Sequence, residues 1–249
     1  MAKISQLDHE FARNAATEAG NLLLKIREDA RDSSVPFTQI GPAGDARAHE
    51  FLIKLISETY PDDAILSEEG TDDPSRLEAD RVWIIDPLDG TREYCIDGRS
   101  DWAVHVALVS SHSPDVGAVA LPSLGETFCT LRPEAPPAPT GQTRVICSRT
   151  RPVPVADFIA KQLDGELLFM GSAGAKAMAV ITGDADIYAH TGGQSEWDSC
   201  APVAVALASG FHASRLDGTP LRYNQKDLYV PDLLICRKEL ANTVLTLLN

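Results

Sequence analysis

Two carboxylates three residues apart follow an apolar run near the middle of the chain. Residues 82–85, Val-Trp-Ile-Ile, have the length and composition of a strand that is covered on both faces. In residues 86–91, Asp-Pro-Leu-Asp-Gly-Thr, the proline cannot continue a sheet ladder and the glycine permits a turn, so we expect the strand to stop at Asp86. Asp86, Asp89 and the Leu88 carbonyl can then converge. Such hard oxygen ligands suit Mg²⁺, which keeps waters for a phosphate substrate.

Two further acidic segments have a similar placement. Glu68 follows residues 64–66, a short apolar strand candidate, and Asp198 falls in the first turn of a helix expected over residues 197–209. Taken singly, each site has an ordinary explanation, since Asp89 could cap the next segment and a helix dipole favours an acid in its first turn. Together these carboxylates could hold two or three divalent cations if the fold assembles them: Glu68, Asp86, Asp89 and Asp198.

These motifs resemble those of the inositol monophosphatase superfamily of Mg²⁺-dependent, lithium-sensitive phosphatases. The similar segments are W-I-I-D-P-L-D-G-T at residues 83–91, S-E-E at 67–69 and E-W-D-x-x-A-P at 196–202. Residues 92–94, Arg-Glu-Tyr, are similar to the K/R-E-F/Y of the 3′(2′),5′-bisphosphate nucleotidases of the CysQ type, whereas inositol phosphatases typically show T-N-F. The resemblance runs from the first helix to about Arg237. It implies a layered αβαβα sandwich of the sugar-phosphatase kind.

The resemblance also implies metal ligands. One ion would be held by Glu68, Asp86 and the Leu88 carbonyl, and another by Asp86, Asp89 and Asp198, with a third, weaker position near Glu68. Two such cations can clamp the attacking and departing oxygens of an in-line displacement at phosphorus.

The resemblance implies that Thr91 positions the attacking water and that Asp45 takes its proton. Glu68 is counted with them as a catalytic residue. Asp45 is preceded by Gly-Pro-Ala-Gly, which departs from the usual T-x-A-D of the family. An aspartate there is equally suited to be the N-cap of the second helix.

Substrate recognition is expected in the second half of the chain. Residues 171–176, Gly-Ser-Ala-Gly-Ala-Lys, lie between an expected strand and helix, so Ser172, Lys176 and the backbone N–H groups could bind a phosphate or a ribose. The alternative is an ordinary strand-to-helix turn, and this version is nearer to the sugar-phosphatase pattern than to the G-S-S-L-K of the nucleotidases. Ser148 and Arg149 are candidates for a second phosphate, because arginine binds phosphate bidentately. The remaining expected substrate contacts are Gly90, Thr91 and Asp198.

Composition limits the function classes. The 44% hydrophobic content supports a real core, and 36 acidic against 22 basic residues give a net charge of −14. Such a surface repels nucleic-acid polymers, so the expected partner is a small phosphorylated nucleotide or sugar held where metals and local cations reverse the field. Five scattered cysteines predict reduced thiols and a cytoplasmic setting, and neither a secretory leader nor a membrane span is recognisable. The six histidines lack ligand spacing and are expected to be packing or surface residues. A homodimer is left open.

The remaining periodicities predict an α/β protein in two parts. An α+β domain over residues 1–140 would carry most metal ligands, and an α/β domain over residues 141–249 would carry Asp198 and the substrate-recognition residues. The boundary is set at the proline-dense stretch 132–141. Expected helices cover residues 7–26, 45–60, 155–163, 173–182, 197–209 and 241–248, and expected strands cover residues 102–109, 116–121, 127–131, 145–147, 167–170, 185–190 and 233–236.

The sequence therefore predicts a Mg²⁺-dependent phosphomonoesterase that removes the 3′-phosphate of 3′-phosphoadenosine 5′-phosphate. One alternative is a broader sugar phosphatase acting on inositol 1-phosphate or fructose 1,6-bisphosphate. The alternative from another class is a non-catalytic metal- or phosphate-binding paralogue, against which the complete set of carboxylates argues.

Overall fold

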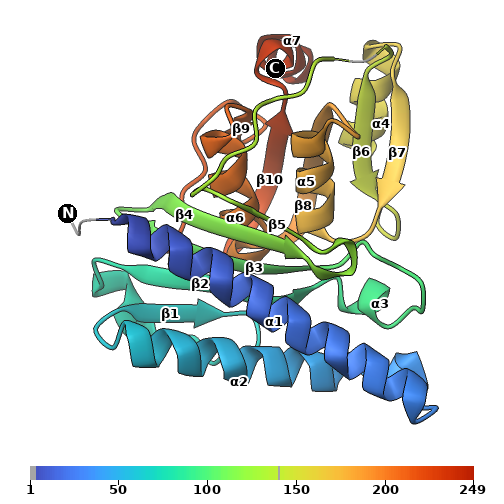
Figure 1. Cartoon of the computed structure of the whole chain (residues 1–249). Coiled ribbons are helices and arrows are strands. Elements are labelled where there is room, and N and C mark those ends of the chain that lie inside the picture. The colour runs from blue at the N-terminus through green and yellow to red at the C-terminus, as the bar shows by residue number, and fades with distance from the viewer. Residues whose placement is uncertain (1–3, 140) are drawn as a thin grey trace.

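Five layers of secondary structure build the protein. The computed structural model describes residues 4–139 and 141–249 and alternates helix pairs with two five-stranded sheets (Figure 1). From one side to the other the layers are α1 with α2, the first sheet, α5 with α6, the second sheet, and α4 with α7. The predicted α/β class and αβαβα layering are confirmed.

The first layer is a pair of amphipathic helices, α1 (Gln6–Asp32) and α2 (Gly41–Thr59). Alanines at the buried face of α1 allow it to lie close against the sheet. The second helix was predicted over residues 45–60, but α2 begins earlier, at Gly41. Pro42 lies in its first turn, where a backbone N–H has no partner within the helix and the lack of one in proline breaks no hydrogen bond. Asp45 consequently lies inside the helix, and the N-cap interpretation of this residue is wrong.

The first sheet is antiparallel except for its first pair of strands. Its strands, in spatial order, are β1 (Ala64–Ser67), β2 (Val82–Asp89), β3 (Ala103–Ser110), β4 (Ser113–Leu121) and β5 (Glu126–Cys129). On β2, Trp83 and Ile85 face the α1–α2 layer, whereas Val82 and Ile84 face α5 and α6, which explains the uninterrupted apolar run. The strand does not stop at Asp86 as predicted. It continues to Asp89 across an irregularity in its pairing with β3, which accommodates the proline.

The second half contributes the middle helices and the second sheet. The middle helices are α5 (Ala173–Thr182) and α6 (Glu196–Ala208), and α5 has the predicted bounds. The spatial order of the second sheet is β7 (Glu166–Met170), β6 (Arg144–Ser148), β8 (Ile187–Ser195), β10 (Tyr229–Cys236) and β9 (His212–Ser214). The outer face is covered by α4 (Pro154–Gln162) and α7 (Lys238–Leu248), and short helical turns occupy Phe37–Gln39, Pro74–Glu78, Thr91–Tyr94 and Pro122–Leu124.

The proline-dense connection is tied to the second half by Arg237, whose guanidinium donates to the Pro137 carbonyl over 2.7 Å. One hydrophobic cluster extends from the first sheet through α5 and α6 into the second sheet. The division into domains 1–140 and 141–249 stays a prediction, and its boundary at Thr140 lies outside the described residues.

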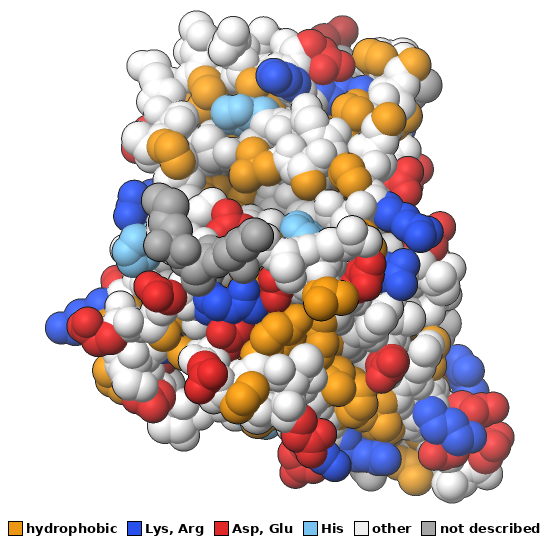
Figure 2. Space-filling model, turned by 60° about the vertical axis from the view of Figure 1, so that its left-hand side comes forward, with side chains coloured by type: hydrophobic (Ala, Val, Ile, Leu, Met, Phe, Trp, Pro, Cys, Tyr) orange, Lys and Arg blue, Asp and Glu red, His pale blue; other side chains and the backbone are white. Residues whose placement is uncertain are grey.

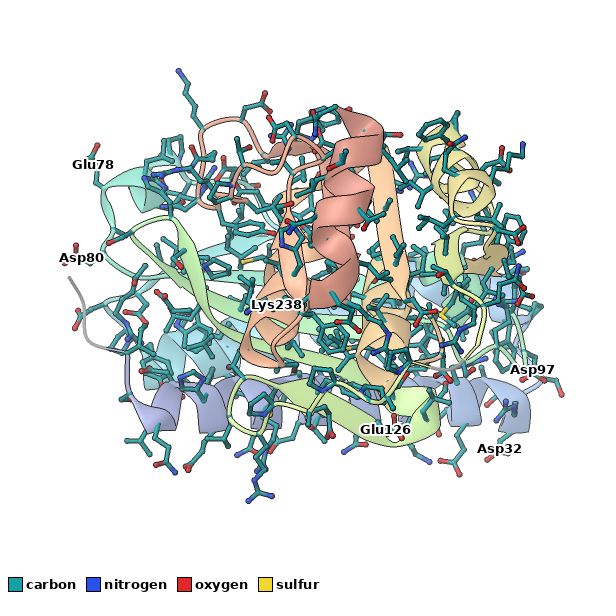
Figure 3. The ribbon with its side chains drawn as sticks, turned by 90° about the horizontal axis from the view of Figure 1, so that it is seen from above. Asp32, Glu78, Asp80, Asp97, Glu126 and Lys238 are labelled. Carbon is teal, nitrogen blue, oxygen red and sulfur yellow. The ribbon has the colours of Figure 1, made fainter. Side chains whose placement is uncertain are left out.

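Charged side chains are distributed over the outside of the molecule. In the view from above, the labelled residues Asp32, Glu78, Asp80 and Asp97 lie at the periphery (Figure 3). On the face shown in Figure 2, acidic and basic side chains are interspersed with each other and with hydrophobic side chains. Every helix in residues 4–139 and 141–249 is too short or too polar to be a candidate membrane span.

Candidate active site

A polar cavity of about 340 Å³ lies where the two sheets and α5 and α6 meet, a volume typical of small-ligand sites. It is bounded by the end of β2, the loop after β6, the start of α5, β8 and the start of α6. Every expected site residue except Asp45 and Arg149 lines it: Glu68, Asp86, Leu88, Asp89, Gly90, Thr91, Ser148, Ser172, Lys176 and Asp198.

Three carboxylates form the centre of the cavity. Asp86, Asp89 and Asp198 each offer an oxygen atom, and these atoms lie within 4.8 Å of one another. Asp86 is almost fully buried, and its Oδ1 accepts from the Leu88 N–H at 3.0 Å. Burial, together with the charges of Glu68 and the other two aspartates, raises the pKa of Asp86 well above its usual range. Carboxylates this close together require a proton or a cation between them.

Asp89 is held by groups from outside β2. Its Oδ2 accepts from the Gly174 N–H at 2.7 Å and lies 3.2 Å from His105 Nε2, and its Oδ1 accepts from the Ala173 N–H at 3.2 Å. Burial opposes ionisation of Asp89, but the hydrogen bond and charge of His105 and the Gly174 N–H hold its pKa below the ordinary value. Asp89 is therefore an ionised, fixed carboxylate.

Asp198 and Glu68 complete the cluster from two other elements. Asp198 lies in the first turn of α6, where its Oδ2 accepts from the Ser195 N–H at 2.6 Å in a capping box. Burial and then the Asp89 charge raise the pKa of Asp198 to about 6. The Glu68 side chain is exposed as a whole, but its carboxyl is desolvated at the cavity edge and shares a hydrogen bond with Asp86, and its pKa is raised to about 7.

Thr91 connects the cluster to Asp45. The Thr91 hydroxyl lies 3.2 Å from the Leu88 carbonyl oxygen and 3.5 Å from Asp45 Oδ1, and both oxygens are possible acceptors. Asp45 is buried behind Thr91. That burial, with the Glu69 charge, raises the pKa of Asp45 to about 7 against the lowering effect of the Thr91 hydroxyl. A carboxyl with this pKa is suited to accept a proton near neutral pH.

The start of α5 forms the cavity wall opposite β2. Ser172 caps the helix by accepting from the Ala175 N–H at 2.9 Å, and Gly90, with φ of 87°, leaves no room for a Cβ, which would lie 2.9 Å from Ser172 Cβ. The Lys176 ammonium donates to the carbonyls of Gly171 and Ser172. Burial lowers the pKa of Lys176 to about 8 against the raising effect of nearby carboxylates.

The two candidates for a second phosphate have different environments. Ser148 lines the cavity, and its hydroxyl accepts from the Arg151 N–H at 3.1 Å. Arg149 instead donates to Glu93 Oε1 at 2.7 Å and does not line the cavity. The neighbouring Arg151 lies there in its place.

Residues that the sequence did not suggest also shape the site. His105 on β3 places its Nε2 3.2 Å from Asp89 Oδ2, and its Nδ1 lies 3.0 Å from the Trp197 carbonyl oxygen. Tyr188, His190 and Gln194 on β8 line the cavity beside Arg151. The spacing of the histidines in the sequence does not indicate a site. The sequence connects β8 with the site only through its position directly before the acidic start of α6.

The donor set is that of a hard divalent cation. All the converging ligands are oxygens, without thiol or imidazole among the three central groups, and this selects Mg²⁺-like ions over softer metals. With a cation present, the cavity could bind a phosphate group and hold a water close to Thr91 and Asp45.

Comparison with known proteins agrees with this geometry. The sequence model of the inositol monophosphatase family matches residues 5–135 and 141–248. A Mycobacterium bovis protein named 3′-phosphoadenosine 5′-phosphate phosphatase is 51% identical over 92% of this chain and 88% of its own length, and a Mycobacterium leprae protein of the same name is 48% identical over 96% and 92%. The crystal structure of CysQ from Bacteroides thetaiotaomicron, described as a bacterial member of the family, superposes with a TM-score of 0.80 at 28% identity, covering 94% of this chain and 98% of its own. With its layered fold and its cluster of carboxylates, the chain belongs to the inositol monophosphatase family, as its motifs predicted.

Proposed function

We propose that this protein is a Mg²⁺-dependent phosphomonoesterase that removes the 3′-phosphate of 3′-phosphoadenosine 5′-phosphate, leaving AMP and inorganic phosphate. The observation that carries the proposal is the 51% identity, over 92% of the chain, to a protein named for that activity. The assembled carboxylates support it, because a non-catalytic paralogue has no need for all of them.

Two or three Mg²⁺ ions fit the residues present. One ion would be held by Glu68, Asp86 and the Leu88 carbonyl. A second would be held by Asp86, Asp89 and Asp198. A third, more weakly bound ion would lie near Glu68. Bound Mg²⁺ supplies Lewis acidity, which spreads the charge of the phosphoryl oxygens and makes a water more acidic.

The chain's own groups position and deprotonate the nucleophile. Thr91 would orient a water toward phosphorus, and Asp45 would take its proton through the Thr91 hydroxyl. The water oxygen forms the new bond to phosphorus, the bond from phosphorus to the 3′-oxygen breaks, and the 3′-oxygen takes a proton from solvent. Gly90 and Thr91 would hold the phosphate oxygens through backbone N–H groups, and Ser172 would do so through its hydroxyl. The N–H groups at the start of α5 already donate to Asp89, Asp101 and Ser172.

A small substrate is supported by charge. The net charge of −14 opposes binding of nucleic-acid polymers, so we infer a small phosphorylated partner. The five cysteines are all free thiols, and this supports our proposal of a cytoplasmic setting. A homodimer stays a proposal.

The test compares kcat/KM for 3′-phosphoadenosine 5′-phosphate, inositol 1-phosphate and fructose 1,6-bisphosphate in Mg²⁺, with Asp86→Asn as the inactive control. We expect the bisphosphorylated nucleotide to be preferred at least about tenfold, which corresponds to about 1.4 kcal/mol of transition-state binding. Preference for either sugar phosphate would overturn the proposal in favour of a broader sugar phosphatase. Absence of phosphate release from all three would indicate a binding protein.

A further inference from the structure

The wall of the cavity formed by β8 contains buried polar atoms without partners. Among the described residues, the buried side-chain atoms that lack a hydrogen-bond partner include His190 Nδ1 and Gln194 Oε1. Both side chains are about 95% buried, and both residues line the cavity. Burying a polar atom without a partner is costly, so their retention here points to a ligand.

Neighbouring contacts determine what these atoms can bind. His190 Nε2 lies 2.7 Å from the Gly192 carbonyl oxygen, so that nitrogen carries the hydrogen and Nδ1 is an acceptor. Burial, then the charges of Lys176 and Arg151, lower the pKa of His190 to about 4, so the ring is neutral at pH 7. Gln194 Nε2 donates to the Tyr188 hydroxyl at 2.9 Å, which leaves Oε1 as a second acceptor. The wall therefore requires donors, such as sugar hydroxyls or a base amino group.

The positively charged side chain of Arg151 lies directly beside these acceptors. An added Cβ on Gly193 would lie 3.0 Å from a guanidinium nitrogen of Arg151, so Arg151 lies over the strand between His190 and Gln194. Within residues 4–139 and 141–249, no ion pair or hydrogen bond engages its guanidinium, whereas Arg149 two residues earlier is neutralised by Glu93. An exposed arginine at the edge of an acidic cavity is suited to hold a phosphate bidentately.

We propose that Arg151 binds the second phosphate of a bisphosphorylated nucleotide and that His190 and Gln194 accept hydrogen bonds from its hydroxyl or amino groups. The inference rests on the proposed function and assigns the recognition of the part of the substrate that is not hydrolysed. It also explains how a strongly acidic chain can select the more highly charged of two phosphate esters.

The experiment measures kcat/KM of the parent, Arg151→Ala and Arg151→Lys toward three esters. The esters are 3′-phosphoadenosine 5′-phosphate, 3′-AMP, which lacks the second phosphate, and 4-nitrophenyl phosphate, which lacks hydroxyl and amino groups. We expect Arg151→Ala to reduce kcat/KM for the bisphosphate roughly 10- to 150-fold, as for loss of a charged hydrogen bond, and to leave the other two within about twofold. Arg151→Lys should retain part of the preference, and Arg132→Ala, at an exposed arginine outside the cavity, should change nothing.

Gln194→Leu tests the acceptors separately. It should reduce kcat/KM for both nucleotides roughly tenfold and spare 4-nitrophenyl phosphate, and the affinity for AMP measured by calorimetry should fall in parallel. If the parent prefers the bisphosphate and Arg151→Ala keeps that preference, or if Arg151→Ala slows all three esters alike, the inference is wrong. A parent that treats the bisphosphate and 3′-AMP equally also contradicts the inference, because nothing then recognises the second phosphate. The proposed function itself fails only if the parent prefers a sugar phosphate or releases no phosphate.

Discussion

Asp89 makes more protein contacts than any other carboxylate in the cluster. Two backbone N–H groups of α5 and the His105 ring all reach its two oxygens, so its position is fixed before any ligand arrives. Pre-positioned ligands of this kind reduce the reorganisation that metal binding and phosphoryl transfer require. The residue therefore serves both the local structure and the proposed chemistry.

Asp89→Asn should abolish most activity while the protein stays folded. The amide removes one charge and, having a single oxygen, cannot accept from both α5 N–H groups, which costs about 1–3 kcal/mol of stability. We expect kcat to fall at least about 10³-fold, because metal contacts supply several kcal/mol of transition-state stabilisation. Turnover and thermal unfolding should be measured together, with the exposed Asp32→Asn as control. Turnover close to that of the parent at saturating Mg²⁺ would remove Asp89 from the site.

Single residues also mark the limit of what the sequence reveals. The carboxylates were predictable because each follows a strand or starts a helix in a recognisable motif. Arg149 and Arg151 are two residues apart in one loop. Only the three-dimensional structure shows that Arg149 pairs with Glu93 whereas Arg151 reaches β8. His105 has no partner nearby in sequence, since its contacts come from β2 and α6.

At the scale of elements, the start of α5 connects the carboxylate cluster to the segment that we propose to bind phosphate. Asp89 bonds the first turn of α5, and the same turn contains Ser172 and Gly174. The approach is close, because an added Cβ on Gly174 would lie 2.2 Å from His105 Nε2. The sequence predicted α5 with its bounds, but not this contact, since the register of α5 against β3 depends on the whole middle layer.

Gly174→Ala tests this packing. Alanine normally stabilises a helix relative to glycine by about 0.5–1 kcal/mol, but relieving the clash should cost about 1–3 kcal/mol and displace either α5 or His105. We expect a Tm lower by roughly 2–8 °C and a larger proportional loss of kcat/KM.

The control for Gly174→Ala is the same change combined with His105→Ser, which removes the obstructing ring. If the clash is the cause, the double variant loses less unfolding free energy than the sum of the losses in the two single variants. Strict additivity would show that Gly174 matters for another reason.

At the scale of the whole molecule, the fold brings negative charges together from distant parts of the chain. Glu68 follows β1, Asp86 and Asp89 belong to β2, and Asp198 starts α6 in the other half, so the cluster exists only once the two halves are packed. The layered class was predictable from alternating helical and strand periodicities. The extension of β2 was not, because its pairing with β3 overrides the local effect of Pro87. The early start of α2 was missed for a different reason, since Pro42 is favourable in the first turn of a helix.

This arrangement predicts a specific dependence of stability on pH and metal. In the metal-free protein the pKa values of Asp45 and Glu68 are raised to about 7 from ordinary values of 3.8 and 4.5. At pH values between the ordinary and the raised pKa, these two groups bind more protons in the folded state than in the unfolded state. Their contribution to stability is therefore largest at acid pH and is lost as pH rises through about 7. The proposed Mg²⁺ would bind the ionised carboxylates of the folded state only, so its stabilisation should grow over the same interval.

Thermal unfolding should therefore be followed from pH 5 to 8 with a chelator and with millimolar Mg²⁺. Glu196 also has a pKa raised to about 7, but its carboxylate accepts from the Asn224 and Gln225 N–H groups and faces away from the cluster. Its contribution is the same with and without metal, so the difference between the two curves isolates the cluster. We expect the Tm difference to be small at pH 5 and to increase steadily to pH 8. A difference that is absent, or that shrinks as pH rises, would mean that these carboxylates do not share a cation in the folded protein.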